Sequence, residues 1–138
     1  MKKLFIALFC LSLGFSLNVN AQAKAAGAQF KFKDGDTYDF GEVPEGPDVT
    51  HDFVFSNTGN QPLIIQDAHP SCSCTTPEWP KQPVGPGQTD KIKVGFHTKD
   101  HPGAFIKEVY IQSNATNNPG GDKRYTIYIK GTVKSDKK

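Results

Sequence analysis

Leucine and methionine are scarce in most of this 138-residue sequence. Five of the six leucines lie within the first seventeen residues, only Leu63 lies beyond them, and the single methionine is Met1. Helices favour such unbranched side chains because they lose little rotamer freedom there. Beyond residue 21 the chain instead offers seven Val, seven Ile, ten Thr and twelve aromatic residues, which suit strands. The composition therefore argues against a helix bundle, a coiled coil and a polytopic membrane protein.

Sequence motifs for common enzymatic chemistry are missing as well. The chain has no phosphate-cradling glycine loop, no Gly-x-Ser-x-Gly and no dinucleotide fingerprint. No nucleophile, base and acid can be grouped from the sequence, because their proximity depends on the fold. We therefore expect no catalytic activity and no resident cofactor.

The leucine-rich start has the three-part layout of a secretory signal peptide. Lys2 and Lys3 precede an apolar run over residues 4–17, and Val19 and Ala21 occupy the −3 and −1 positions of a cleavage site. The run is shorter than the roughly 20 apolar residues that a membrane span needs. We expect residues 1–21 to be removed near Ala21. This predicts a periplasmic or secreted protein without stable membrane insertion.

Cleavage changes the charge and the cysteine content of the chain. The remaining 117 residues have 14 Lys and Arg against 14 Asp and Glu, so the net charge falls from +2 to 0. A neutral chain gives no support for nucleic-acid binding. Cys10 leaves with the signal peptide, and only Cys72 and Cys74 remain.

The mature chain consists of short alternating runs separated by turn residues. We expect a disordered lead-in over residues 22–29, a sandwich over 30–133 and a charged tail over 134–138. Residues 41–47, with two Pro and two Gly, are expected to form a loop. The predicted strands cover residues 29–33, 37–40, 49–55, 63–68, 90–96, 104–112 and 123–133. This spacing predicts an all-β fold, an immunoglobulin-like antiparallel β-sandwich of about seven to eight strands.

One segment is rich in proline. Pro77, Pro80, Pro83 and Pro86 recur every three residues, the period of a polyproline II helix. Proline donates no backbone hydrogen bond, so this segment is not a central strand. We interpret it as a stiff connector that crosses from one sheet to the other, with Trp79, the only tryptophan, anchoring it to the body of the protein.

Four further residues are expected to have structural roles in turns. Asn57 begins an Asn-Thr-Gly-Asn turn, in which Gly59 can take a positive φ. Pro86 and Gly87 belong to a second turn sequence, Gly-Pro-Gly.

In this order and spacing, several short pieces resemble the bacterial family DUF1573. The resemblance spans residues 30–133, and its pieces are Phe-Gly-Glu-Val at 40–43, Phe-Val-Phe-Ser-Asn-Thr-Gly-Asn at 53–60, Pro-Leu at 62–63, Ser-Cys-Ser-Cys-Thr at 71–75, Val-Gly-Pro-Gly at 84–87, Gly-Ala-Phe at 103–105 and Ile-Lys-Gly at 129–131. The family usually has Gly where this chain has Ser73. The resemblance implies an exported immunoglobulin-like sandwich, similar to pilus chaperones and the ciliary Hydin and ASPM modules. It implies no established reaction.

The cysteine pair is the feature with reactive chemistry. In an extended segment Cys72 and Cys74 face the same side, with a spacing of ~6.6 Å between Cα atoms. Disulfides span up to roughly 6.8 Å, with a mode nearer 5.5–6 Å, so a bridge requires the segment to pucker. Three interpretations stay open, namely a local structural disulfide, a soft-metal site such as Cu(I), and a redox-active dithiol.

Histidines extend the metal interpretation. His69 precedes the cysteine pair, and two thiolates with one imidazole suit Cu(I) or Zn²⁺. His97 and His101 are possible further ligands, but we interpret them as solvated turn residues. His51 alternates with phenylalanines and is expected to be a partly buried strand residue.

The sequence therefore predicts an exported, non-catalytic domain. Its expected role is the binding or scaffolding of an unknown envelope or extracellular protein, with an exposed sheet edge as one possible contact. The alternative is a thiol-redox or copper-handling protein that uses Cys72 and Cys74.

Overall fold

The structure is a computed structural model that describes residues 25–119, 121 and 124–135. It contains eight strands: β1 (Phe30–Phe32), β2 (Thr37–Pro44), β3 (Val49–Asn57), β4 (Ile65–Pro70), β5 (Thr75–Glu78), β6 (Thr89–Phe96), β7 (Gly103–Ser113) and β8 (Arg124–Lys134). The prediction of an all-β sandwich with seven to eight strands is confirmed. Within the described residues, no helix is long and apolar enough to cross a membrane.

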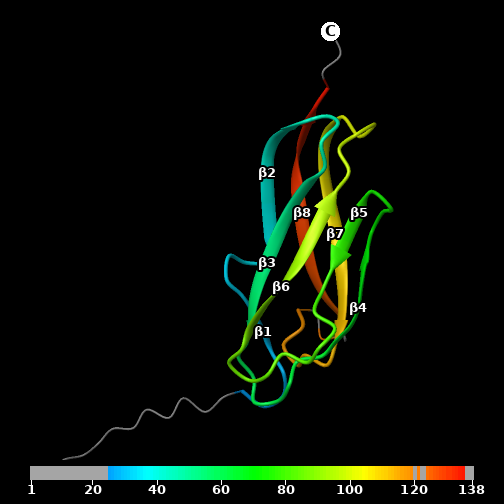
Figure 1. Ribbon diagram of the computed structural model, residues 1–138. Coiled ribbons are helices and arrows are strands. Elements are labelled where there is room, and N and C mark those ends of the chain that lie inside the picture. The colour runs from blue at the N-terminus through cyan, green and yellow to red at the C-terminus, as the bar shows by residue number, and fades with distance from the viewer. Residues whose placement is uncertain (1–24, 120, 122–123, 136–138) are drawn as a thin grey trace, which may run out of the picture.

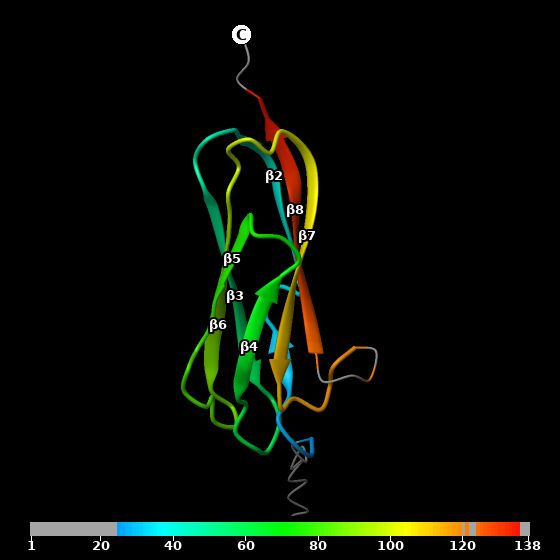
Figure 2. The same cartoon turned by 90° about the vertical axis from the view of Figure 1, so that its right-hand side faces the viewer.

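The strands form two packed four-stranded sheets (Figures 1 and 2). The first sheet has the order β1-β3-β6-β5 and the second has the order β2-β8-β7-β4. Neighbouring strands are antiparallel except β2 and β8, which run parallel. The second sheet is therefore mixed, which differs from the purely antiparallel arrangement that the sequence predicts.

The core lies between the inward faces of the two sheets. Every second residue of the central strands points inward, so apolar and polar positions alternate. The fully buried side chains include Phe55, Ile92 and Val94 of the first sheet and Ile111 and Ile127 of the second. The one leucine of the described residues, Leu63, is also fully buried and pairs with Val84 in an isolated bridge.

Two connections join edge strands of different sheets along the open sides of the sandwich. Residues 33–36 lead from β1 to β2, and we call this connection the glycine crossing because it turns at Gly35. Residues 71–74 lead from β4 to β5, and we call this one the cystine crossing because it contains Cys72 and Cys74. The position of each crossing sets the point at which the pairing of β1 with β3, or of β4 with β7, ends.

The second strand is longer than the sequence predicts. Residues 41–47 were expected to form a loop, but β2 continues to Pro44 after a bulge between Asp39 and Glu42. Gly41 has a φ of +66° in this bulge, and its N–H donates to Asp39 Oδ1. The turn-like composition therefore marks an irregularity within a strand.

The proline segment also differs from its prediction. Residues 75–78 form strand β5, which contains Pro77, and the segment after it joins β5 to β6 within the same sheet. The predicted role as a connector between sheets is therefore wrong. Pro77 is tolerated because β5 is an edge strand with a partner on one side only. The change of sheet takes place earlier, at the cystine crossing.

The predicted disordered lead-in over residues 22–29 is ordered where the structure describes it. Residue Ala28 is 1% exposed, and its carbonyl accepts from the N–H of Thr116 at 2.8 Å. The N–H of Thr58 donates to the carbonyl of Gln29 at 3.1 Å. These bonds hold the segment between two loops, which its small polar residues do not reveal. The predicted signal peptide (1–21) and residues 136–138 of the predicted tail lie outside the described residues.

Candidate functional site

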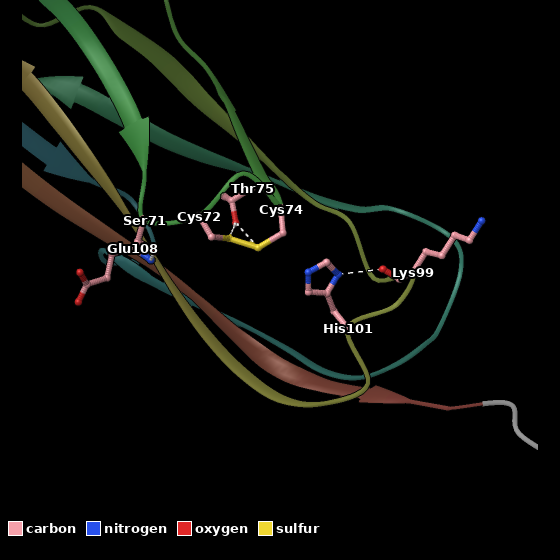
Figure 3. Close-up of a disulfide and its surroundings, with 7 residues drawn as sticks. All are labelled: Ser71, Cys72, Cys74, Thr75, Lys99, His101 and Glu108. Atoms are coloured by element: carbon pink, nitrogen blue, oxygen red, sulfur yellow. Dashed lines mark hydrogen bonds between the residues drawn. A yellow bond between two sulfur atoms is a disulfide. The ribbon is translucent and has the colours of Figure 1, made fainter.

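Cys72 and Cys74 form a disulfide within the cystine crossing (Figure 3). Their Cα atoms are 5.3 Å apart, closer than in an extended strand. The segment turns at this point because it leaves β4 in one sheet and enters β5 in the other. The sequence alone left the oxidised and reduced forms open, and the structure has the oxidised form.

The two sulfurs have unequal surroundings. Cys74 is buried, with 7% of its surface exposed, whereas Cys72 is half-buried. The hydroxyl of the buried residue Thr75 lies 3.5 Å from Cys72 Sγ and 3.9 Å from Cys74 Sγ. A solvent-borne group therefore reaches Cys72 more easily, and one hydroxyl can donate to either sulfur.

His101 belongs to the surroundings of the disulfide that Figure 3 draws, although the sequence suggested only a solvated turn residue. Its Nδ1–H donates to the carbonyl of Lys99 at 2.8 Å. In the neutral ring this bond places the proton on Nδ1. The second nitrogen, Nε2, then has a lone pair and makes no bond to Lys99. The ring and this second nitrogen point toward the sulfurs (Figure 3).

The cause of this proximity is a long-range strand register. Thr75 of β5 pairs with Phe96 of β6, and the N–H of His97 donates to the carbonyl of Cys74 at 2.9 Å. The loop after β6 is thereby carried to the disulfide. No local pattern in the sequence indicates that the loop after β6 lies near the disulfide, because β5 was not predicted.

The proposed metal ligand His69 has another polar partner. Its Nδ1 lies 2.8 Å from Asp67 Oδ2, and its ring centre is 6.3 Å from that of Tyr110 on the neighbouring strand. In the oxidised form Cys72 and Cys74 offer no thiolates. Among the described residues, no three His, Cys, Asp or Glu side chains are grouped to hold a metal ion. The copper hypothesis therefore concerns only a reduced form of this site.

The side chains of the other two histidines have partners outside the disulfide turn. His97 Nδ1 lies 2.8 Å from Asp48 Oδ2, which ties the loop after β6 to the loop before β3. His51 stacks on Tyr38 with ring centres 3.5 Å apart, a contact that joins β3 to β2. Burial lowers the pKa of His51, and the negative charges of Asp52 and Asp34 oppose this effect.

Asn57 holds the opposite end of the sandwich together. It is fully buried, and its Nδ2 donates to the carbonyls of Gln61 and Val84 at 2.7 and 2.9 Å. Its Oδ1 accepts from the N–H groups of Gln29 and Gly59 at 3.2 and 3.0 Å. All four hydrogen-bonding positions of the amide are used, which is how a polar group tolerates burial.

The predicted turn residues have different physical reasons. The N–H of Gln88 donates to the carbonyl of Gly85 across Pro86 and Gly87, and Gly87 has a φ of +78°. This is a type II turn, with proline and glycine at the positions that favour them. Gly59 has no positive φ, so the reason predicted for it is wrong. A Cβ at Gly59 would lie 1.9 Å from the carbonyl oxygen of Gly27, and the close backbone approach requires glycine.

Trp79 is half-buried and packs against the hydrophobic core. Lys81 Nζ lies 3.2 Å from the centre of its ring, in cation–π geometry. Trp79 therefore holds the β5–β6 connector against the body of the protein and lies apart from the disulfide turn in sequence.

Within the part of the chain that the structure describes, a segment of β7 next to the cystine crossing has a strand on one side only. The pairing of β4 with β7 ends at Pro70 and Val109, and the last bonds join Ser71 to Glu108. Beyond this point, residues 103–107 of β7 pair only with β8 among the described residues. We call these residues the open stretch of β7.

The backbone direction on the open stretch of β7 follows from its neighbours. The N–H and carbonyl of Glu108 face the β4 side, where they bond to Ser71. Backbone groups alternate in direction along a strand, so those of Ile106 and Ala104 face the same side. Ile106 is also the more exposed of the two large hydrophobic side chains found at the described surface, at 70%. Among the described residues, the backbone groups of Ala104 and Ile106 that face the β4 side have no strand partner, and both side chains are apolar and exposed.

These features define a class of protein, an all-β sandwich with a disulfide-closed crossing beside an uncovered strand segment. The chain belongs to the family described as "Protein of unknown function (DUF1573)", whose model matches residues 19–133. None of the curated proteins compared with the chain matches it.

Similar solved structures support the fold. A protein of unknown function from Porphyromonas gingivalis W83 matches with a TM-score of 0.66 and 14% identity, over 83% of this chain and 51% of that chain. The chain thus spans about half the length of that protein. The ASH/PapD-like domain 7 of human CEP192 matches with a TM-score of 0.56 and 9% identity, over 92% and 99%. The VesB protease of Vibrio cholerae matches with a TM-score of 0.52 and 17% identity, over 76% and 31%. At these identities the likeness concerns the fold alone.

Proposed function

We propose that this protein is an exported, non-catalytic binding module that takes an extended segment of a partner polypeptide along the open stretch of β7. The N–H and carbonyl of Ile106 face outward there, and an added strand would pair with them as β4 pairs with the residues from 109 onward. Such pairing supplies affinity through the backbone, and neighbouring side chains supply selectivity. The partner is an envelope or extracellular protein.

The observation that carries this proposal is the contrast with the other uncovered segment of the sandwich. β1 leaves β3 at Lys33, whose N–H donates to the carbonyl of Val54 at 2.9 Å. Residues 50–52 of β3 then pair only with β6 among the described residues, and we call them the open stretch of β3. It presents Thr50 and Asp52, and Asp52 forms an ion pair with Lys91 at 2.6 Å. Charged and polar side chains protect a sheet edge, whereas Ile106 and Ala104 do not.

The four edge strands also have features that discourage strand addition. The strand β1 has three residues, and β5 contains Pro77. The strand β2 has a bulge at Asp39 and Glu42, and β4 has one between Ile65 and Asp67. Short strands, prolines and bulges all weaken an edge as a template for pairing. The open stretch of β7 has no proline and no bulge, and its one charged residue, Lys107, is half-buried with its backbone groups on the β8 side. It is therefore the best template among the described residues.

Two features support a location outside the cytoplasm. The first 21 residues have the layout of a signal peptide, and the mature chain has a disulfide. Disulfides persist in oxidising compartments and are rare in the cytosol. The location remains part of the proposal, and intact mass of the native protein tests it through the cleavage point near Ala21.

The binding test compares prolines on the two open stretches. Ile106→Pro removes an outward N–H from the open stretch of β7, and Thr50→Pro removes the equivalent N–H from that of β3. Each variant and the wild type are used to capture proteins from the envelope of the native cell. We expect a partner that the wild type and Thr50→Pro retain and that Ile106→Pro loses, with thermal unfolding showing that all three proteins are folded.

Amide hydrogen exchange identifies the residues of this protein that the partner covers. In the captured complex, amide hydrogen exchange at Ala104 and Ile106 should slow relative to the free protein. Equal capture by both proline variants, or unchanged exchange at these amides, would overturn the proposal. Slowing that appears when the purified protein alone is concentrated would assign the stretch to a second copy of this chain and would also overturn it.

A further inference from the structure

The disulfide is asymmetric in a way that assigns different chemistry to its two sulfurs. Cys72 is half-buried and Cys74 is 7% exposed, so an attacking thiolate has better access to Cys72 Sγ. Cys74 then has to leave with the electron pair of the S–S bond. We propose that this disulfide is a thiol-exchange site in which Cys72 is the attacked residue and Cys74 is the leaving group.

The surroundings of Cys74 suit a leaving thiolate. The Thr75 hydroxyl is 3.5 Å from Cys72 Sγ and 3.9 Å from Cys74 Sγ, so it is within reach of Cys74 Sγ when negative charge develops there. The second ring nitrogen of His101 points toward the sulfurs, and its protonated form is a donor and a positive charge (Figure 3). The bond from Nδ1 to Lys99 holds the ring in this orientation. His101 is a positioning and proton-donating residue in this scheme.

The exchange balances without a cofactor. The sulfur of the incoming thiolate forms a bond with Cys72 Sγ, the Cys72–Cys74 bond breaks, and Cys74 Sγ takes the electron pair and then a proton. A second thiolate attacks the mixed disulfide, which releases the oxidised substrate disulfide and leaves Cys72 and Cys74 as thiols. The protein disulfide is the oxidant, and two substrate thiols are oxidised in one stoichiometric round. The substrate class is a solvent-accessible thiol.

This site stands independently of strand binding. It lies next to the open stretch of β7, because Ser71 of the cystine crossing bonds to Glu108 at 2.8 Å. A partner laid along that stretch would bring its own side chains close to Cys72. The exchange chemistry requires only a thiol, so glutathione serves as the probe and no partner is needed.

The first test identifies the attacked sulfur. The folded oxidised protein is mixed with excess reduced glutathione, and free thiols are blocked with an alkylating agent during the reaction. We expect mass spectrometry of the peptide to find glutathione on Cys72 and the alkyl group on Cys74. The reverse assignment, an even mixture, or a disulfide that stays oxidised while the protein remains folded would overturn the proposal.

The second test separates His101 from a structural role. His101→Gln should slow the exchange by about ten- to a hundredfold. This range ends at about a hundredfold, the smallest contribution that is typical of a positioned proton donor. The matched control is His97→Gln, because the side chain of His97 bonds to Asp48 and takes no part in the exchange scheme. This variant should keep the exchange rate within roughly a factor of two of the wild-type rate. Both variants should have the melting temperature of the wild type. Equal rates in the two variants would remove His101 from the mechanism.

Discussion

The two crossings solve the same structural problem with different chemistry. At the glycine crossing, the N–H of Lys33 donates to Val54 in one sheet, and the carbonyl of Asp36 accepts from Tyr128 in the other at 2.7 Å. At the cystine crossing, the N–H of Ser71 donates to Glu108 in one sheet, and the carbonyl of Cys74 accepts from His97 in the other. Each crossing is thus tied to both sheets by backbone bonds, and only one adds a disulfide.

This difference suggests that the disulfide is not required to change sheets. It links residues two apart, so it closes a very short loop. In the chain-entropy model, a loop of three residues contributes only about 1.6 kcal/mol, well below the value for long loops. The bond therefore adds less stability than a disulfide between distant residues would. A small structural benefit is consistent with a chemical role for the pair.

The crossings also differ in what they leave uncovered. The glycine crossing exposes Thr50 and the ion-paired Asp52, whereas the cystine crossing exposes Ala104 and Ile106. A polar edge resists pairing with another chain, and an apolar one invites it. Both the disulfide and the proposed binding stretch therefore lie on the side of the molecule with the cystine crossing.

The largest loss of stability is expected from a substitution in the glycine crossing. Gly35 has a φ of +87°, and there is open space around a Cβ placed on it. Valine at this position is strained through its backbone alone, so Gly35→Val should lower the free energy of unfolding by about 1–3 kcal/mol. Urea unfolding measures the loss. Gly35→Asn is the control and should lose less, because Asn tolerates the left-handed region better.

Reduction of the disulfide should have an effect in the lower half of the range expected for Gly35→Val. We expect the reduced wild type to remain folded and to lose about 1.6 kcal/mol in the free energy of unfolding. The measurement is urea unfolding with and without reductant, with the double variant Cys72→Ser/Cys74→Ser as a protein that cannot respond to reductant. Complete unfolding on reduction would show that the cystine crossing is a structural necessity, unlike its counterpart.

Acid should lower the stability of the protein through His51, which stacks on Tyr38 of β2 near the glycine crossing. The pKa of His51 is lowered by burial, so the unfolded chain binds more protons than the folded one near and below its ordinary value of 6.5. Stability is therefore full above this pH and falls as the pH drops through the folded pKa. Asp34→Asn removes a charge that raises the pKa of His51, so the loss of stability in acid should become larger. His51→Gln removes the titrating group, so the stability should depend less on pH in this range. Thermal unfolding between pH 7 and 5, roughly, follows the effect, which we expect to be smaller than that of reduction.

The smallest effect on stability is expected at Ile106. This side chain is 70% exposed, so Ile106→Thr should change the free energy of unfolding by less than about 0.5 kcal/mol. Denaturant unfolding checks this directly. A large loss would mean that Ile106 supports the fold, and its exposure would then no longer argue for binding.

The sequence predicted the strands that have clear alternation and missed those interrupted by turn residues. The runs around Phe53, Ile92 and Ile127 have a period of two and a buried face, and each is a strand. Residues 75–78 were missed because Pro77 is a poor strand residue except at an edge. Edge position depends on the order of strands in the sheet, which local patterns do not contain.

The candidate site was predictable only in part. The spacing of Cys72 and Cys74 drew attention to the reactive pair, and the need for a turn followed from the reach of a disulfide. The position of His101 depended on the pairing of β5 with β6, and the open stretch of β7 depended on where β4 ends. Both are consequences of register between distant segments. The sequence had favoured His69 as the helper, since it is the nearer histidine along the chain.

Amide hydrogen exchange in a complex with a captured partner shows which open stretch accepts a strand. We propose that the open stretch of β7 accepts one and that the open stretch of β3 does not. We predict slower exchange at Ala104 and Ile106 on binding, with unchanged exchange at Thr50 and Asp52. Protection of Thr50 and Asp52 with none at Ala104 and Ile106 would instead assign strand binding to the open stretch of β3.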